Sequence, residues 1–166
     1  MEGVGGGFWI GRTFKESLQK GVRGVEVGAF GIGSDAKDLW GTERQPSDED
    51  IRIKLARPNP DRVWYLRYAL KSGMTIDEIY KITAIDRWFL DHLAEIVEME
   101  DHLRSIGSLS ALTPGTMRMA KRVGFSDRQL ATMLSRDADE ARSWRKSQGI
   151  VAVCKAVDNG AGGCET

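Results

Sequence analysis

Cysteine, histidine and proline are scarce in this 166-residue chain, which contains two, two and four of them. Two cysteines, Cys154 and Cys164, cannot build the disulfide framework of a small secreted domain, and their spacing matches neither a zinc site nor a thioredoxin motif. No apolar run approaches the ~20 residues that a membrane-spanning helix needs. A basic start followed by an apolar stretch is also missing. These absences predict an intracellular, cytoplasmic protein with unbridged thiols.

An excess of either charge is missing as well. Lys+Arg and Asp+Glu number 24 each, so there is no overall electrostatic attraction to nucleic acid, acidic membranes or acidic substrates. Hydrophobic residues at 41% and aromatic residues at 8% are ordinary values for a globular protein. A chain of this length can bury a real core. Any basic surface must therefore be local.

What the chain does contain is a series of helix start and stop signals, most of them between about residues 47 and 148, with little strand-like alternation. Capping boxes or N-caps predict helix starts at Thr13, Ser47, Asn59, Thr75, Asp86, Thr113, Ser126 and Asp137. Gly28, Pro58 and Gly73 are predicted helix stops. The sequence predicts an all-α fold, an irregular helical bundle or superhelix of about 7–8 short helices.

Part of this pattern occurs twice, 51 residues apart. The matching pairs are Gly73/Gly124, Met74/Phe125, Thr75/Ser126, Glu78/Gln129, Ile79/Leu130 and Asp86/Asp137. In order, each pair supplies a helix stop, a staple residue, an N-cap, its capping-box partner, the staple partner and the next N-cap. We therefore expect an internal two-fold repeat of a helical hairpin, packed copy against copy.

Residues suited to chemistry are few and poorly grouped. His92 and His102 stand near four acidic residues, Glu95, Glu98, Glu100 and Asp101, without a metal-ligand motif. We interpret these as the solvated outer face of an amphipathic helix. No catalytic, cofactor-binding or metal-ligating residue is predicted.

Two glycine clusters suggest phosphate loops but lack the context for one. Only two residues precede Gly3–Gly7, which leaves no room for a preceding strand, and no Gly-Lys-Ser/Thr follows. We interpret it as a frayed terminus, and we interpret Gly31-Ile32-Gly33 as a surface loop anchored by Trp40.

A DNA-binding helix-turn-helix is the alternative from another functional class. Ser126–Leu134, a turn and Asp137–Gln148 have its layout, and residues 118–148 hold eight Lys/Arg against four Asp/Glu, a charge of +4. However, three acids crowd the start of the would-be recognition helix, where they would repel the phosphate backbone. Salt-dependent DNA affinity that is lost on replacing Arg142 and Arg145 would favour this alternative.

Several ordered blocks of the sequence resemble one known family. They are residues 10–20 (IGRTFKESLQK), 24–28 (GVEVG), 67–70 (RYAL), 73–80 (GMTIDEIY), 83–90 (TAIDRWFL), 124–127 (GFSD), 149–150 (GI) and 155–158 (KAVD). Together they resemble the central helical oligomerisation domain of the carbamoyl-phosphate synthase large subunit and the junction before it. The chain departs from the family pattern in three places: Gly5-Gly6-Gly7-Phe8-Trp9 before the Ile-Gly-Arg block, Gly21, where alanine is common, and Asn159–Cys164 after the last block.

The resemblance implies an architectural role. Residues 1–41 would be a glycine-rich arm with one helix at the junction with the preceding ATP-grasp half, 42–150 the helical oligomerisation domain, and 151–166 an extended tail. In the family this domain links two ATP-dependent synthetase halves of an enzyme that makes carbamoyl phosphate for pyrimidine and arginine synthesis. ATP and Mg²⁺ would bind those halves and not this chain.

The partners implied are the flanking halves, another copy of the subunit and the glutaminase small subunit, with no membrane or nucleic acid. Trp40, Trp64, Trp88 and Trp144 are the expected source of exposed apolar surface for such contacts.

Overall fold

The computed structural model describes residues 9–25, 29–35 and 37–151, and within these ranges the chain is all-α. Eight α-helices and one 3-10 helix follow one another as α1 (Phe14–Val25), α2 (Asp48–Ala56), α3 (Arg62–Lys71), α4 (Ile76–Thr83), α5 (Arg87–Ile106), η1 (Leu109–Ala111), α6 (Pro114–Val123), α7 (Asp127–Met133) and α8 (Ala138–Ser147). The predicted fold class and number of helices are confirmed. None of these helices is long and apolar enough to cross a membrane, among the residues described.

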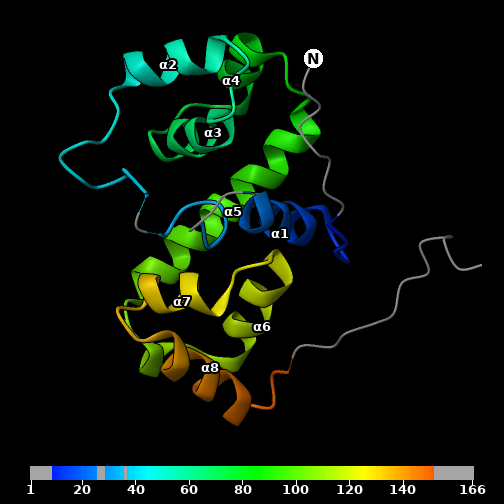
Figure 1. Cartoon of the computed structure of the whole chain (residues 1–166), viewed down its shortest axis with the longest axis vertical. Coiled ribbons are helices and arrows are strands. Elements are labelled where there is room, and N and C mark those ends of the chain that lie inside the picture. Colours follow the sequence, from blue (N-terminus) through cyan, green and yellow to red (C-terminus); the bar gives the residue numbers. More distant parts are fainter. Residues whose placement is uncertain (1–8, 26–28, 36, 152–166) are drawn as a thin grey trace, which may run out of the picture.

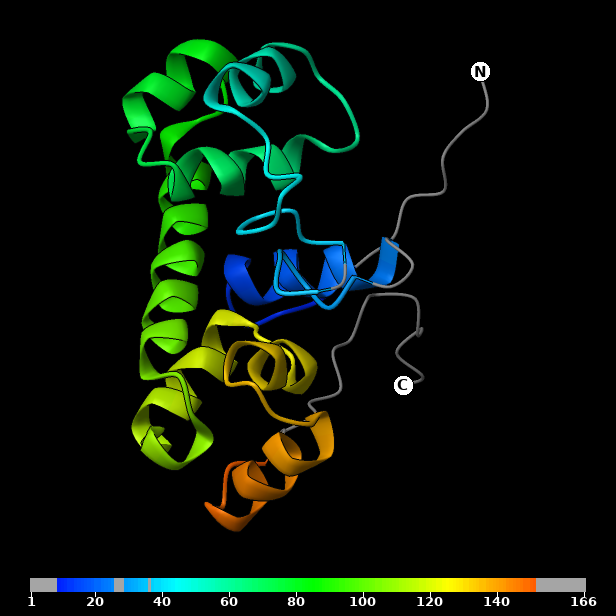
Figure 2. The same ribbon diagram turned by 90° about the vertical axis from the view of Figure 1, so that its left-hand side faces the viewer.

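The 20-residue helix α5 is the spine of the molecule (Figure 1). Helices α2, α3 and α4 gather at its N-terminal end, and α6, α7 and α8 gather at its C-terminal end. Helix α1 lies across the spine between the two groups and contacts both α5 and α6 (Figure 2). One continuous apolar core runs through both groups, since α5 contributes Leu90, Leu93, Ile96 and Leu103 along its length.

Most of the predicted helix starts are confirmed as caps. The hydroxyls of Ser47, Thr75 and Ser126 accept the predicted amide, and each of these three caps is a reciprocal capping box. Three further predicted N-caps, Asp86, Thr113 and Asp137, also accept a first-turn amide. Such caps satisfy amides that no carbonyl of the helix can reach, which is why short helices depend on them.

Two cap predictions need correction. Asn59 does not begin α3, whose N-cap is Asp61; its side-chain amide instead donates to Lys54 O at 2.8 Å and Arg57 O at 2.7 Å, which closes the end of α2. The Thr13 hydroxyl accepts from Glu16 N, but the Glu16 carboxylate accepts from Arg12 N, one residue before the expected cap amide. The predicted stop at Gly28 lies outside the described residues.

At the turns, the two copies of the predicted repeat have the same local geometry. Gly73 and Gly124 have φ of +90° and +97°, a conformation that glycine adopts without a steric penalty. The amide after each glycine donates to the carbonyl five residues earlier, Met74 N to Ala69 O and Phe125 N to Ala120 O. The arrangement of the whole hairpins as a two-fold pair stays a prediction.

Gly21 and Trp9, which belong to two of the departures from the family pattern, meet at α1. A Cβ atom at Gly24 would lie 2.4 Å from the Trp9 indole nitrogen, and one at Gly21 would lie 3.5 Å from the same ring. The glycines are one helical turn apart, so they form a flat strip that receives the indole. The cost of about 1 kcal/mol for glycine inside a helix therefore accompanies a contact that a larger residue at position 24 would block.

Candidate interaction surfaces around a buried centre

The segment Ala29–Asp35, which follows α1, is buried in the middle of the molecule. Gly31-Ile32-Gly33 was expected at the surface, but Ile32 is 1% exposed and belongs to the core. Gln19 of α1 and Gln129 of α7, both fully buried, hold it: Ile32 N donates to Gln19 Oε1 at 3.1 Å, and Gln129 Nε2 donates to Gly33 O at 3.3 Å. The segment therefore joins the early part of the chain to the C-terminal helices.

A buried ion network joins the same segment to α3 and α5. Arg67 makes two bidentate pairs, with Glu100 at 2.7 and 2.8 Å and with Asp38 at 2.8 Å for both bonds. The side chains of Arg67 and Glu100 are 1% and 0% exposed. Arg104 donates to Glu100, and Ser34 bonds to both Glu100 and Arg104. We call Asp38, Arg67, Glu100 and Arg104 the central network.

Glu100 was interpreted as part of the solvated outer face of α5, and its burial in the central network shows that this interpretation is wrong for Glu100. Burial opposes the charge on Glu100, but the hydrogen bonds and charge of Arg67, with Lys71 and Arg104, outweigh it and lower the pKa of Glu100 to about 2. The hydrogen bonds and charges of Glu100 and Asp38 raise the pKa of Arg67 above its ordinary value, against the effect of burial. Both groups are therefore charged at neutral pH.

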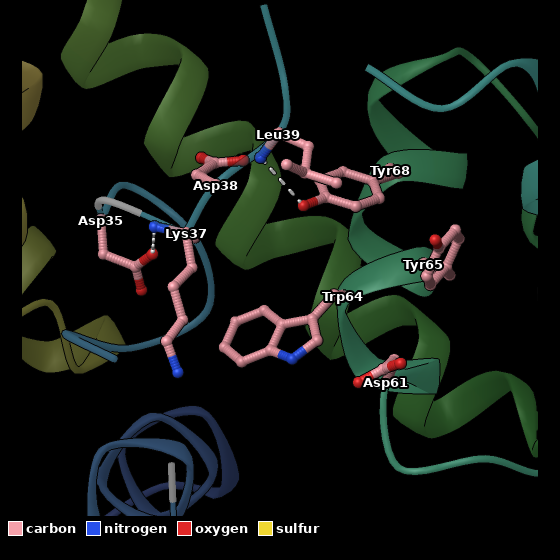
Figure 3. A pocket seen from close by; sticks show the side chains of 9 residues that line it. Asp35, Lys37, Asp38, Leu39, Asp61, Trp64, Tyr65 and Tyr68 are labelled. Carbon is pink, nitrogen blue, oxygen red and sulfur yellow. Dashed lines mark hydrogen bonds between the residues drawn. The ribbon is translucent and has the colours of Figure 1, made fainter. Parts of the chain in front are cut away.

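Beside the network, an aromatic pocket of about 230 Å³ opens between α3 and the segment Asp35–Leu39. Figure 3 shows Trp64 and Tyr68 of α3 facing this segment, with the Tyr68 hydroxyl accepting from Leu39 N at 3.2 Å. Arg67 and backbone amides use both oxygens of Asp38. Asp35 and Asp61 are the other carboxylates that line the pocket.

Near the N-terminus of α5 the surface carries a cluster of rings, which we call the aromatic patch: Phe14, Trp88, Phe89 and His92. Phe89 was expected on the buried face of α5, yet it is 43% exposed, and Trp88 is 52% exposed. Phe14 of α1 packs against both, with ring centroids 5.1 and 5.3 Å away. Both α1 and α5 therefore contribute rings to the patch.

The other tryptophans expected at the surface behave differently. Trp40, Trp64 and Trp144 are partly buried and pack against the core, so Trp88 is the one of the four predicted tryptophans that is more than a third exposed.

The candidate metal ligands do not come together. His102 is exposed, as expected, whereas His92 packs in the aromatic patch and Glu100 is committed to Arg67. No group of three or more His, Cys, Asp or Glu side chains able to hold a metal occurs in the part of the chain that the structure describes. Gly3–Gly7, Cys154 and Cys164 lie outside that part.

A second opening, the basic hollow, has a volume of about 360 Å³ and lies among α1, the segment after it, α7 and α8. Its lining residues are Arg23, Ala29, Phe30, Ser126, Asp127, Arg128 and Arg142. Asp127 accepts bonds from Arg145 at 2.9 and 3.0 Å and from Lys121 at 3.1 Å.

Arg145 therefore cannot be a base-reading residue. It is 7% exposed, it pairs with Asp127, and it donates to Ile150 O. Because this side chain is committed to the fold, nothing in the described structure favours the helix-turn-helix alternative.

Comparison with known proteins identifies the family of this all-α unit. Residues 8–149 match the family model described as "Carbamoyl-phosphate synthetase large chain, oligomerisation domain". The carbamoyl phosphate synthase large chain of Rhodopirellula baltica is 58% identical over 95% of this chain and 15% of its own length. The arginine-specific chloroplastic large chain of Arabidopsis thaliana is 40% identical over 95% of this chain and 13% of its own.

A third relative is a shorter protein. The "large chain, N-terminal section" of Aquifex aeolicus is 39% identical over 98% of this chain and 27% of its own length. The chain thus spans between about an eighth and about a quarter of these relatives. Since the family match covers nearly all of the described helical unit, this chain belongs to the oligomerisation-domain family of the carbamoyl-phosphate synthetase large chain.

Proposed function

We propose that the chain is a non-catalytic scaffold that holds synthetase modules together and associates with a second copy of itself. The observation that carries this proposal is the extent of the family match, residues 8–149, which coincides with one continuous core. In this proposal the helical unit as a whole acts as the oligomerisation domain.

The complete assembly in this proposal makes carbamoyl phosphate in the cytoplasm, for pyrimidine and arginine synthesis. ATP and Mg²⁺ bind the synthetase halves and not this chain, and a glutaminase small subunit supplies ammonia. The names of the relatives support the reaction, and the arginine-specific name of the Arabidopsis relative supports one of its uses.

Self-association is assigned to the aromatic patch. Exposed aromatic side chains gain free energy when a partner covers them, and Trp and Tyr are enriched where interface binding energy concentrates. Trp88 and Phe89 are neighbours on one surface and are backed by Phe14, so a second copy would meet a preformed apolar area.

The test is the mass of the 166-residue chain by size-exclusion chromatography with light scattering, over a range of concentration and salt. We expect a dimer or larger species that persists at high salt, and a monomer for Trp88→Gln combined with Phe89→Gln. Ile53→Gln combined with Met119→Gln is the matched control, because both residues are exposed and apolar but lie elsewhere.

A strict monomer at every concentration would contradict self-association through this chain. Equal masses for the patch variant and the control would contradict the assignment to the patch. ATP hydrolysis or carbamoyl phosphate formation by this chain alone would contradict its non-catalytic role.

A further inference from the structure

Among the described residues, the basic hollow concentrates more positive charge than its single carboxylate, Asp127, balances. Five basic side chains line it or bond to its one carboxylate: Arg23, Lys121, Arg128, Arg142 and Arg145. Asp127 is the one acidic residue among its lining residues, counted over the described ranges. For a chain whose overall charge is zero, this is a strong local excess.

Asp127 is already occupied. Its two oxygens accept hydrogen bonds from Arg145 and Lys121. Burial lowers the pKa of Lys121, and the charges of Arg145 and Arg23 lower it further, whereas Asp127 raises it. This carboxylate is therefore bound by two cations of the fold and is outnumbered by the basic side chains around it.

Three guanidinium groups line the hollow, and among the described residues only Arg142 has a carboxylate within ion-pair distance. Arg23 donates to Gly124 O at 2.8 Å, and the Arg128 guanidinium lies over the Phe30 ring, 5.4 Å from its centroid. Arg142 has only a 3.8 Å approach to Asp127. Burial lowers the pKa of Arg23 more than nearby Glu16 raises it.

These groups come from three elements, α1, α7 and α8, and converge on one opening. Guanidinium groups bind oxyanions through charge-assisted hydrogen bonds with fixed geometry, and three of them suit a multiply charged anion with several oxygens better than one carboxylate.

We propose that the basic hollow is a binding site for a phosphate group, carried either by free phosphate or by a small phosphate ester. Arg128 and Arg142 donate to its oxygens from the exposed side, and Arg23 contributes from the half-buried side. The inference goes beyond the scaffold role and is independent of it, because phosphate binding and self-association are measured separately.

The experiment is a titration of the 166-residue chain with inorganic phosphate, followed by ³¹P NMR at neutral pH and matched ionic strength. We expect saturable broadening of the phosphate signal. Arg128→Gln combined with Arg142→Gln should weaken binding by at least ~10-fold, which is the loss expected for one hydrogen bond to a charged group. Arg136→Gln is the matched control, since Arg136 is an exposed arginine between α7 and α8 that does not line the hollow.

A second titration with glycerol phosphate distinguishes the two sources of the group. Tighter binding than that of inorganic phosphate supports an ester ligand, and equal or weaker binding supports free phosphate.

Three outcomes overturn the proposal. The first is a phosphate signal that the chain does not broaden. The second is an equal loss of binding in the Arg136 variant, which would mean that only general charge attracts the anion. The third is tighter binding of succinate or of duplex DNA than of either phosphate, which would assign the hollow to a carboxylate partner or to nucleic acid.

Discussion

Glu100 and Arg67 show how strongly single residues depend on each other in the centre of this molecule. Replacing a buried ion pair by apolar residues is often harmless, but removing one partner leaves the other charge buried without compensation. Glu100 accepts from Arg67 through both oxygens and from Arg104 through one. Removing either partner should therefore destabilise the fold.

We expect Glu100→Gln to lower the free energy of unfolding by about 3 kcal/mol, measured by urea denaturation at pH 7. Glu98→Gln is the control on the same helix, because Glu98 is exposed; it should change the stability by less than about 0.5 kcal/mol. Equal effects of the two substitutions would contradict the importance of the pair.

The difference between wild type and Glu100→Gln should also depend on pH. The pKa of Glu100 is about 2 in the folded state, below its ordinary 4.5. Its contribution is therefore complete above about pH 4.5 and is lost as the pH falls toward about 2, because the unfolded chain binds the proton first. The stabilities of the two proteins should approach each other over this interval.

Gly33 and Gly41 form a natural pair for separating backbone strain from steric overlap. Their φ angles are +77° and +76°, but a Cβ at Gly33 would lie 2.4 Å from the Arg67 guanidinium, whereas one at Gly41 meets nothing within 4 Å. Gly41→Ala should cost about 1 kcal/mol for the left-handed backbone. Gly33→Ala should cost about 2 kcal/mol more, because the central network must shift. Thermal unfolding of both variants measures the difference; similar costs would show that the network yields easily.

At the scale of elements, the caps of α4 and α7 differ in one respect. The Thr75 hydroxyl caps α4 locally, whereas the Ser126 hydroxyl caps α7 and also donates to Phe30 O at 2.9 Å. Thr75→Ala should destabilise the protein by about 1 kcal/mol and Ser126→Ala by about 2 kcal/mol, since the second also loses a long-range hydrogen bond. Chemical denaturation of both variants checks the order. The reverse order would mean that the bond to the buried segment contributes nothing.

The helix caps were predictable because each is a relation between residues three or fewer positions apart. The same local reasoning failed at Asn59, where the side chain could cap the next helix or close the previous one, and the carbonyls at the end of α2 were the better partners. It also failed at Gly31-Ile32-Gly33, because the sequence alone does not distinguish a glycine in an exposed loop from a glycine packed against buried side chains.

The central network and the basic hollow could not be predicted from the sequence. Glu100 stands between charged neighbours on α5, and nothing local distinguishes it from Glu98, which is exposed. Its burial follows from Arg67, 33 residues earlier in the chain. The excess charge of residues 118–148 was visible, but the contribution of Arg23 and the commitment of Arg145 to Asp127 required the three-dimensional arrangement.

At the scale of the whole molecule, the predicted boundary at residue 42 separates the helical domain from residues that hold its centre. Asp38 completes the pairing of Arg67, and Gln19 of α1 accepts hydrogen bonds from Ile32 N and from Gln129 of α7. The domain boundaries remain predictions, but these contacts suggest a stability test of the boundary between residues 41 and 42.

We expect a fragment of residues 42–150 to be less stable than the full chain by at least about 3 kcal/mol, because Arg67 loses a buried carboxylate. Its thermal transition, followed by far-UV circular dichroism, should be lower and broader. A fragment with the melting temperature and cooperativity of the full chain would show that residues 1–41 are an accessory arm.

The buried segment after α1 has a further consequence for synthesis. Gln19 bonds to Gln129, 110 positions later in the chain. Chains leave the ribosome from the N-terminus, and early segments fold as soon as their partners emerge. Here α1 and the segment that follows it must wait until α7 has left the ribosome, and pausing before that point would leave Gln19 and Ile32 exposed to solvent and to chaperones.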